Sequence, residues 1–328
     1  MSQAGTTNNF YWQTLFAPGV EHLRLDEGDA AIVADGVMTV HADGGSFRVR
    51  CRIECDDAWR AWRVHARSTT GGAIELHADG AGHWTTAQGA RLPALDGAID
   101  VDIAACAYTN TLTIRRLALA AGASSTEAIA YIQIPSLDVE RVTQRYTCLS
   151  RDDAGSAWRC ENLTHPSRYD IRVDGRGIVH DYPAIFARLW PDGDATPLVV
   201  SGIVERDGDV LLLQRNATND HAAGEWEPVS GRVEPGESPG EAVVREVREE
   251  TGLDVELVAP VDTFRFLRGA ARVPRVGIAF HCRVRGGSVV LSSEHDGARW
   301  VHRDALAACL HVPEGVREGL SRFCALSE

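Results

Sequence analysis

The sequence predicts a multidomain chain, with an antiparallel, β-rich N-terminal domain over residues 1–190 and an α/β domain over residues 191–328. Three observations lead to this prediction. At 328 residues the chain is long for one domain. Short alternating runs fill its first half. After a turn-rich stretch, the pattern changes to strands mixed with amphipathic helices.

Alternation of apolar and charged residues marks the first domain. Residues 46–55 (SFRVRCRIEC) and 62–68 (WRVHARS) each place apolar side chains on one face and charged ones on the other. Further short runs, among them residues 111–119 (TLTIRRLAL), are also interpreted as strands, so we expect little helix before residue 190. The charged face could bind phosphate or an anionic headgroup, or it could be solvated sheet surface. Its arginines are Arg48, Arg50, Arg52, Arg63 and Arg67.

The domain boundary is placed in residues 189–197 (LWPDGDATP), which are polar and turn-rich. A hairpin turning at Asp207–Gly208 follows, and residues 275–284 (RVGIAFHCRV) are a further strand. Residues 298–310 are expected to start as a strand and turn helical, and residues 313–327 form a closing helix. Strands and helices mixed in this way predict an α/β domain.

Composition limits the functions that the chain can have. The net charge is −13, which argues against nucleic-acid binding and suits an enzyme that recruits metal cations. All 33 basic residues are arginine, which excludes Schiff-base chemistry and a phosphate-binding-loop lysine. The eight cysteines form no CxxC pair, and neither a signal segment nor a long apolar run is visible. We expect a cytoplasmic protein with reduced thiols, no zinc and no membrane span.

An amphipathic helix with defined ends is predicted from Ser238 to Gly252. Ser238 and Glu241 have the spacing of a capping box, and Pro239 suits the first helical position. Gly252 suits the position that ends the helix. An apolar stripe that can bury against a sheet comprises Val243, Val244 and Val247.

Three glutamates crowd one side of this helix. Glu246, Glu249 and Glu250 stand at i, i+3 and i+4, where like charges repel by a few tenths of a kcal/mol per pair. A divalent cation among them would end the repulsion, and hard oxygen ligands suit Mg²⁺ or Mn²⁺. The alternative is a solvated helix, on which Arg245 pairs with Glu241 and Glu249.

Residues 231–253 (GRVEPGESPGEAVVREVREETGL) resemble the Nudix hydrolase signature at every position that the signature specifies. That signature reads Gly, five residues, Glu, seven residues, then Arg-Glu-apolar-x-Glu-Glu-x-Gly-apolar. The resemblance implies an α/β/α sandwich around a mixed sheet. It also implies Mg²⁺-dependent hydrolysis, with Mn²⁺ as an alternative ion, of the diphosphate in a nucleoside diphosphate linked to another group.

Carried over by position, the resemblance assigns roles to the box residues. Glu249 or Glu250 would also deprotonate the attacking water. Glu237 would support the metal shell, Gly231 would offer its carbonyl to a metal, and Arg245 would orient glutamates. The implied metal ligands are Glu246, Glu249, Glu250, Glu237 and Gly231.

Residues outside the box are further candidates. Glu294 lies where many Nudix proteins carry a functional Glu, and it is either a base, an extra ligand or a loop acid. His295 beside it is expected at the surface. Trp226 and Arg215 are candidate substrate-binding residues, although Trp226 could simply pack. The markers of NADH, dinucleoside polyphosphate and ADP-ribose cleavers are missing or fit poorly, so the substrate stays open.

Most of the first domain, about residues 10–188, resembles a family of bacterial proteins described as putative glycolipid-binding. The resembling segments include ADGAGHWTT, IPSLDVERVTQRYTCL and GRGIVHDYPAIFARLW. The resemblance implies a strongly curved antiparallel sheet, a half-barrel that could hold an apolar or anionic ligand. Candidate polar site residues, or alternatively turn and sheet-edge residues, are Asp100, Asp102, Asn110, Arg115 and Arg116.

Two functions remain open from the sequence. The first is a Nudix hydrolase whose N-terminal domain binds a ligand or a partner. The second is a non-catalytic nucleotide sensor coupled to a lipid- or small-ligand-binding domain. The intact box and the lack of a helix-turn-helix pattern favour the enzyme. The oligomeric state cannot be predicted.

Overall fold

The chain divides into two compact units in the computed structural model, which describes residues 6–28, 31–42, 45–190, 198–217, 223–234, 236–268, 273–308 and 314–326. One unit comprises Met1–Ala17, Glu21–Met38 and Phe47–Pro191, and the other comprises Pro18–Val20, Thr39–Ser46 and Asp192–Glu328. Most of the predicted boundary segment lies outside the described residues. The domain limits 1–190 and 191–328 therefore stay a prediction.

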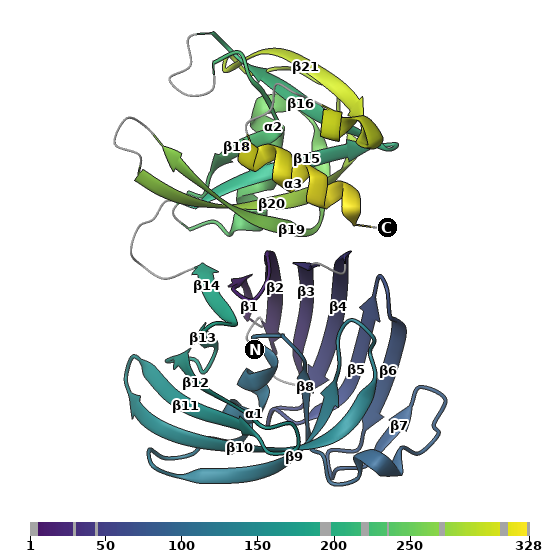
Figure 1. The fold of residues 1–328 in the computed structure, drawn as a ribbon, viewed down its shortest axis with the longest axis vertical. Helices are drawn as coiled ribbons and strands as arrows, with labels where there is room; N and C mark the ends of the chain where they lie inside the picture. Colours follow the sequence, from purple (N-terminus) through teal and green to yellow (C-terminus); the bar gives the residue numbers. More distant parts are fainter. Residues whose placement is uncertain are drawn as a thin grey trace, which may run out of the picture. The chain divides into compact units, whose positions relative to one another are not determined.

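The N-terminal half forms a single curved sheet, as expected (Figure 1). Its 14 strands run in the order β7-β6-β5-β4-β3-β2-β1-β14-β13-β12-β11-β10-β9-β8. The described pairings are antiparallel except for β8 with β9, which is parallel. The elements are β1 (Thr6–Thr14), β2 (Gly19–Glu27), β3 (Ile32–Ala42), β4 (Gly45–Cys55), β5 (Ala61–Ser68), β6 (Gly72–Ala78), β7 (Trp84–Thr86), η1 (Pro93–Leu95), β8 (Asp100–Ile103), α1 (Thr109–Leu117), β9 (Ser124–Ile132), β10 (Val139–Asp152), β11 (Gly155–Asn162), β12 (Ser167–Asp174), β13 (Val179–Tyr182) and β14 (Phe186–Trp190).

The core of this sheet follows the alternation in the sequence. Along β4 the buried side chains are Val49, Cys51, Ile53 and Cys55. Large aromatic side chains complete the core, and two buried tryptophans satisfy their indole nitrogens. The indole nitrogen of Trp12 donates to the Val179 carbonyl at 2.9 Å, and that of Trp84 donates to the Ala98 carbonyl at 2.7 Å.

Helix α1 corrects the prediction of a strand over residues 111–119. The segment alternates Thr with Leu and Ile, which favours a strand locally. In the structure it is a helix that is buried over residues 109–114, and two of its threonine hydroxyls bind the surrounding sheet. Thr109 Oγ1 donates to Asp102 Oδ1 at 2.7 Å, and Thr111 Oγ1 accepts from the Val179 amide at 3.3 Å. Tertiary hydrogen bonding and burial therefore override the local preference.

Glu21 of β2 is a buried acid without a basic partner among the described residues. Only 2% of it is exposed. Cys106 Sγ donates to Oε1 at 2.9 Å, and the Ala107 amide donates to Oε2 at 2.7 Å. Burial raises the pKa of Glu21 to about 7, although these hydrogen bonds act in the opposite direction.

Replacing Glu21 by Gln is expected to make the protein less sensitive to pH. Because the folded-state pKa lies above the unfolded value, the Glu21 contribution to stability is complete below about pH 4.5 and is lost as pH rises to about 7. The whole loss amounts to about 3 kcal/mol. Urea unfolding at pH 5 and pH 8, followed by tryptophan fluorescence, measures it. The difference in the free energy of unfolding between pH 5 and pH 8 should shrink by about 2 to 3 kcal/mol in Glu21→Gln. It should stay unchanged in Asp57→Asn, which alters an exposed acid. An unchanged difference in Glu21→Gln would contradict this account.

The C-terminal half is a mixed sheet between two helices, as expected. The main path runs β17-β16-β15-β20-β19, while β18 pairs with β15 and β21 with β16. Strands β15 and β20 are parallel, and the other described pairings are antiparallel. The elements are β15 (Val199–Arg206), β16 (Asp209–Arg215), β17 (Trp226–Glu227), β18 (Val229–Arg232), α2 (Pro239–Thr251), β19 (Asp254–Arg268), β20 (Val273–Gly286), β21 (His295–His302), η2 (Arg303–Ala308) and α3 (Glu314–Ala325).

Helices α2 and α3 cover opposite faces of this sheet. A Cβ atom on Gly202 would lie 3.1 Å from side-chain atoms of Val243 and Val247 of α2. The next residue, Ile203, joins a core cluster with Leu320 and other residues of α3. Neighbouring residues of a strand point to opposite faces, so the two helices sandwich the sheet.

Most elements of the second half match the predictions, with three corrections. The hairpin at Asp207–Gly208 is confirmed by β15 and β16. Strand β19, which pairs with β20, was not predicted. The segment after β21 forms the 3-10 helix η2 within residues 303–308, and the rest of that predicted helix lies outside the described residues. Val244 is only half-buried, and Ala242 joins Val243 and Val247 in the buried stripe.

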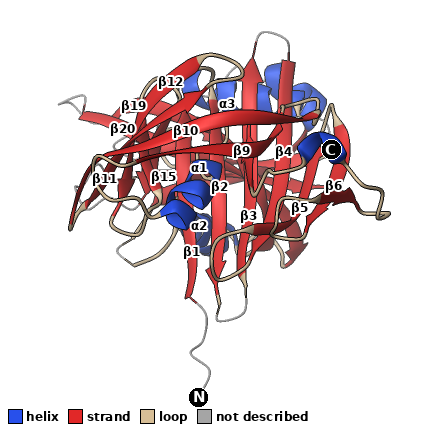
Figure 2. Cartoon of the chain, turned by 90° about the horizontal axis from the view of Figure 1, so that it is seen from below, coloured by secondary structure: helices blue, strands red, loops and turns tan. Residues whose placement is uncertain are grey.

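Figure 2 shows that strands dominate the chain and that helix is confined to short segments. No helix among the described residues has the length and apolar character needed to cross a membrane. The seven cysteines in the described ranges are unpaired thiols, and the eighth, Cys309, lies outside those ranges.

Candidate active site

The predicted capping box holds the start of α2 in place. Ser238 Oγ accepts from the Glu241 amide at 3.3 Å, and the Glu241 carboxylate accepts from the Ser238 amide at 2.8 Å. Gly252 ends the helix in the left-handed conformation, with φ of 68°. Both ends of the helix are thus fixed by local sequence, and the glutamates of its last two turns are presented next to β18.

A single guanidinium group gathers three of the box carboxylates. Arg245 donates to Glu237 Oε1 at 2.7 Å and Oε2 at 3.1 Å. It also donates to Glu246 Oε1 and to Glu249 Oε2, each at 3.0 Å. These bonds lower the pKa of Glu237 and raise that of Arg245. The described residues contain no group of three His, Cys, Asp or Glu side chains placed to hold a metal ion, and here Arg245 neutralises the acids.

Gly231 of β18 makes room for Glu246. A Cβ atom at this position would lie 1.8 Å from Glu246 Cδ and 2.0 Å from Oε1, so only glycine allows the carboxylate to rest against the strand. Burial raises the pKa of Glu246, whereas Arg245 acts against that shift. Gly231 and Glu246 are therefore in direct contact, as a shared site requires.

Glu250 is the buried acid of the helix. Only 7% of it is exposed, and its Oε2 atom has no hydrogen-bond partner. Burial raises the pKa of Glu250 to about 9, and the negative charges of Glu246, Glu227 and Glu294 add to the effect. Glu249, in contrast, has 59% of its side chain exposed. The three glutamates of the helix thus differ sharply in environment, which their spacing alone does not reveal.

Two residues near Glu250 were not predicted as site residues. Glu227 of β17 is 7% exposed and pairs with Arg215, which also donates to Ser230 Oγ at 3.4 Å. His295 is also 7% exposed, so the expectation of a surface residue is wrong. Its Nε2 lies 3.9 Å from Glu250 Oε2, and burial followed by the Arg215 charge lowers the pKa of His295. The sequence signal that could have identified Glu227 was its charge, which is opposite to that of Arg215 on the neighbouring strand.

The two remaining candidates of this half, Glu294 and Trp226, have different surroundings. Glu294 directly precedes β21 and is exposed, and its charge contributes to the raised pKa of Glu250. Trp226 packs on the side of the sheet that α3 covers, with the Arg299 guanidinium 4.2 Å from its ring centroid. Since Glu227 follows Trp226 in a strand, their side chains point to opposite faces. The structure therefore does not bring Trp226 together with Glu250.

The candidate polar residues of the N-terminal sheet separate into two groups. Asp100 and Arg116 form a buried pair through two bonds of 2.7 Å, and Arg116 also binds Glu127. Arg115 stacks over Trp59 at 4.2 Å. Asp102 and Asn110, in contrast, line a cavity. The first group has the contacts of a structural ion pair, and only the second group faces space that a ligand can occupy.

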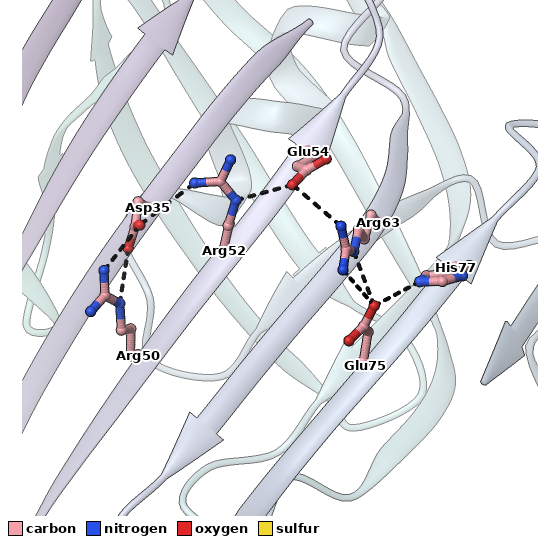
Figure 3. A network of polar contacts seen from close by, with 7 residues as sticks. All are labelled: Asp35, Arg50, Arg52, Glu54, Arg63, Glu75 and His77. Atoms are coloured by element: carbon pink, nitrogen blue, oxygen red, sulfur yellow. Dashed lines mark hydrogen bonds and ion pairs between the residues drawn. The ribbon is translucent and has the colours of Figure 1, made fainter. Parts of the chain in front are cut away.

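Three of the five arginines on the charged face of the sheet, Arg50, Arg52 and Arg63, pair with acids (Figure 3). Arg50 donates to both carboxylate oxygens of Asp35, at 3.2 and 3.1 Å. Arg52 binds Glu54 at 3.0 Å, and Arg63 binds Glu75 at 2.8 Å. The network therefore alternates in sign across β3, β4, β5 and β6. An anion at this face would have to displace these carboxylates.

The chemistry of the donors near α2 suits a divalent cation, although the carboxylates are not grouped around one point among the described residues. Carboxylate oxygens are the ligands that Mg²⁺ and Mn²⁺ prefer, and Glu250 Oε2 is a buried acceptor that lacks a partner. A buried carboxylate without a compensating charge is unfavourable, and a neighbouring cation removes that cost. Exposed pairs such as Arg245–Glu249 contribute at most about 1 kcal/mol, so Glu249 can turn from Arg245 at little cost.

Two family models match the chain. The model described as "Putative glycolipid-binding" matches residues 9–188, and the model described as "NUDIX domain" matches residues 195–323. The chain spans 41%, 32% and 38% of the lengths of the first curated relatives that it matches.

Individual relatives are similar to one half of the chain each. The chain is 55% identical over 56 residues to a CTP pyrophosphohydrolase of Escherichia coli, covering 17% of this chain and 41% of that protein. It is 36% identical over 123 residues to a bis(5'-nucleosyl)-tetraphosphatase of Mus musculus, covering 35% of this chain and 81% of that protein. A solved structure of a DUF1089 family protein from Pseudomonas aeruginosa is 35% identical, covers 52% of this chain and 91% of that one, and has a TM-score of 0.45.

Proposed function

The chain belongs to the Nudix family through its C-terminal half and to the glycolipid-binding-like family through its N-terminal half, and on that basis we propose that it is a pyrophosphohydrolase. Its substrate is a nucleoside diphosphate linked to another group. The observation that carries the proposal is the buried, partnerless oxygen of Glu250 beside Glu246, within an intact box. The relatives named as a CTP pyrophosphohydrolase and a bis(5'-nucleosyl)-tetraphosphatase support the substrate class.

The reaction splits one P–O–P bridge. The oxygen of a water molecule bonds to one phosphorus, the bridging oxygen leaves with the other phosphate, and one proton is released. Mg²⁺ or Mn²⁺, when bound, would supply charge stabilisation at the diphosphate and acidify the attacking water. The carboxylates of Glu246, Glu249 and Glu250 would hold the ion, and Glu249 or Glu250 would accept the proton of the water.

Supporting residues position these carboxylates. Arg245 binds Glu246 and Glu237 at the same time and so ties the helix to the loop before it. Gly231 provides the space in which Glu246 rests and a carbonyl oxygen for the ion. Glu294 serves as a further base or ligand next to Glu250. Arg215, paired with Glu227, lies beside the site and is the better candidate for substrate contact, since Trp226 points to the other face.

The test is hydrolysis by the purified full chain. A panel of nucleoside triphosphates, ADP-ribose, NADH and dinucleoside polyphosphates is incubated with Mg²⁺, and the nucleotide products are separated by anion-exchange chromatography and quantified. We expect turnover of at least one compound, its loss in EDTA and its recovery on adding Mg²⁺ or Mn²⁺. Glu256→Gln, on β19 and paired with Arg285, is a matched control that should keep full activity.

A nucleotide sensor is the competing function. It predicts binding of a panel nucleotide with no turnover in any metal. The same panel, read by calorimetry, separates the two functions, because a sensor binds a nucleotide that it leaves intact.

A cytoplasmic location, without nucleic acid as partner, fits the net charge of −13 and the unpaired thiols.

A further inference from the structure

A cavity of about 320 Å³ lies within the N-terminal sheet, apart from the residues of the Nudix box. It is formed by β8, α1 and the strands from β9 to β14. This volume is at the lower end of the range for small-molecule sites, so it suits a compact molecule and not a long acyl chain.

Aromatic side chains build one wall of the cavity. Tyr169 and Tyr182 lie edge to face with centroids 5.0 Å apart, and Tyr182 and Phe186 are 6.1 Å apart. Phe16 continues the series at 6.2 Å from Phe186, and Tyr131 also lines the cavity. Aromatic rings offer a large apolar surface, and their negative faces attract cations.

A buried carboxylate lies at the same cavity. Asp102 is 8% exposed. Its Oδ1 accepts from Thr109 Oγ1, and its Oδ2 accepts from Gln144 Nε2, both at 2.7 Å. The Tyr146 hydroxyl binds Gln144 Oε1 at 2.7 Å and thereby fixes the orientation of that amide. All these partners are neutral, so the hydrogen bonds orient Asp102 but bring it no positive charge, and burial raises the pKa of Asp102 although these bonds act in the opposite direction.

Asp100, two residues earlier on β8, differs from Asp102 because it has a basic partner. The Arg116 guanidinium lies 2.7 Å from its carboxylate. Asp102 has no basic partner among the described residues, and a buried charge without a counter-charge is costly. A ligand that brings a positive charge would remove that cost.

The other residues that line the cavity bring no positive charge to Asp102, since no Arg or His is among them. The second acid there, Glu161, has Arg145 at 3.8 Å from one of its oxygens. Burial, followed by the Asp102 charge, raises the pKa of Tyr131 to about 12, so its hydroxyl stays neutral. The cavity is therefore acidic and aromatic, which disfavours the anionic ligand that we considered from the sequence.

We propose that this cavity binds a small organic ammonium compound, with the cationic nitrogen against Asp102 and the carbon groups among the tyrosines. Recognition of this kind combines a buried carboxylate with ring faces, and a desolvated cation gains from both. A neutral sugar could use the same hydrogen-bonding groups, but it would leave the charge of Asp102 without compensation.

The test compares two probes that differ in charge and hardly in shape. Choline and its neutral isostere 3,3-dimethyl-1-butanol are titrated into the full chain by calorimetry, in EDTA so that hydrolysis plays no part. Ethanolamine and methyl glucoside complete the set. We expect choline or ethanolamine to bind, and the neutral isostere to bind roughly tenfold more weakly or worse.

Variants assign the binding to the cavity. Asp102→Asn should weaken the ammonium probe roughly tenfold or more and leave the neutral isostere unchanged. Tyr169→Leu, at a half-buried position, is a second variant that should also weaken binding of the ammonium probe. It keeps the test valid if Asp102→Asn does not fold. Asp170→Asn, an exposed acid on β12 that pairs with Arg159, is the control and should bind as the parent does.

Three outcomes would overturn the proposal. One is that neither ammonium probe binds, and another is that the neutral isostere binds as tightly as choline. The third is that methyl glucoside binds and both ammonium probes do not, which would identify a neutral polyol site. None of these outcomes bears on the hydrolase, whose test needs a divalent ion and the other half of the chain.

Discussion

Replacing Glu250 by Gln is expected to lower kcat by roughly 10³-fold on whichever substrate the panel identifies. Gln keeps the size and the hydrogen-bonding oxygen of the side chain, but it loses the negative charge. Glu250 is the most buried of the three box glutamates on α2, so solvent cannot replace its role. The measurement is steady-state kinetics at saturating Mg²⁺.

The melting temperature of the Glu250→Gln variant distinguishes a loss of catalysis from a loss of folding. The parent buries a carboxylate oxygen without a partner, close to the charges of Glu246 and Glu227. Burial and the neighbouring acids raise the pKa of Glu250 to about 9, so the metal-free parent keeps this carboxyl protonated at neutral pH at a cost to stability. Neutral glutamine avoids that cost, so the metal-free variant should melt at the same temperature as the parent or higher. Activity equal to that of the parent would show that Glu250 is neither a ligand nor a base.

Replacing Gly231 by Ala is expected to lower kcat/KM by roughly 100-fold, although the substitution adds only one methyl group. The new Cβ atom would lie 1.8 Å from Glu246 Cδ, so the carboxylate must move away from β18. The substitution lowers the rate because it displaces the Glu246 carboxylate, and a displacement of about 1 Å at a catalytic group reduces the rate by about this factor.

Gly286→Ala is the matched control for this prediction. A Cβ atom on Gly286, at the end of β20, would have no atom within 4 Å, so its activity should equal that of the parent. Thermal unfolding and metal titration of Gly231→Ala complete the test. Unchanged kinetics would mean that Glu246 does not act from the position it has against Gly231.

Local signals carried the predictions that the structure supports. The capping box, the end of α2 at Gly252 and the hairpin at Asp207–Gly208 depend on residues close together in the chain. The alternation along β4 likewise reports which face is buried. Such features follow from backbone geometry and short-range hydrogen bonds, which the sequence displays directly.

Features that depend on distant partners were missed or misjudged. Helix α1 carries a strand-like pattern and becomes helical because Asp102 and Val179 bind its threonines. His295 looks like a loop residue until β21 places it beside Glu250. Their spacing at i, i+3 and i+4 made the three glutamates look alike, although their exposure differs because the sheet covers only one side of the helix.

The multiple bonds of Arg245 bear on the order in which the protein matures. Many metal centres fold only when the ion arrives, because their ligands repel one another beforehand. Here one guanidinium contacts Glu237, Glu246 and Glu249, and the capping box secures the start of the same helix. The positive charge of the chain itself thus offsets the repulsion among these acids, so we expect this helix to form before a cation binds.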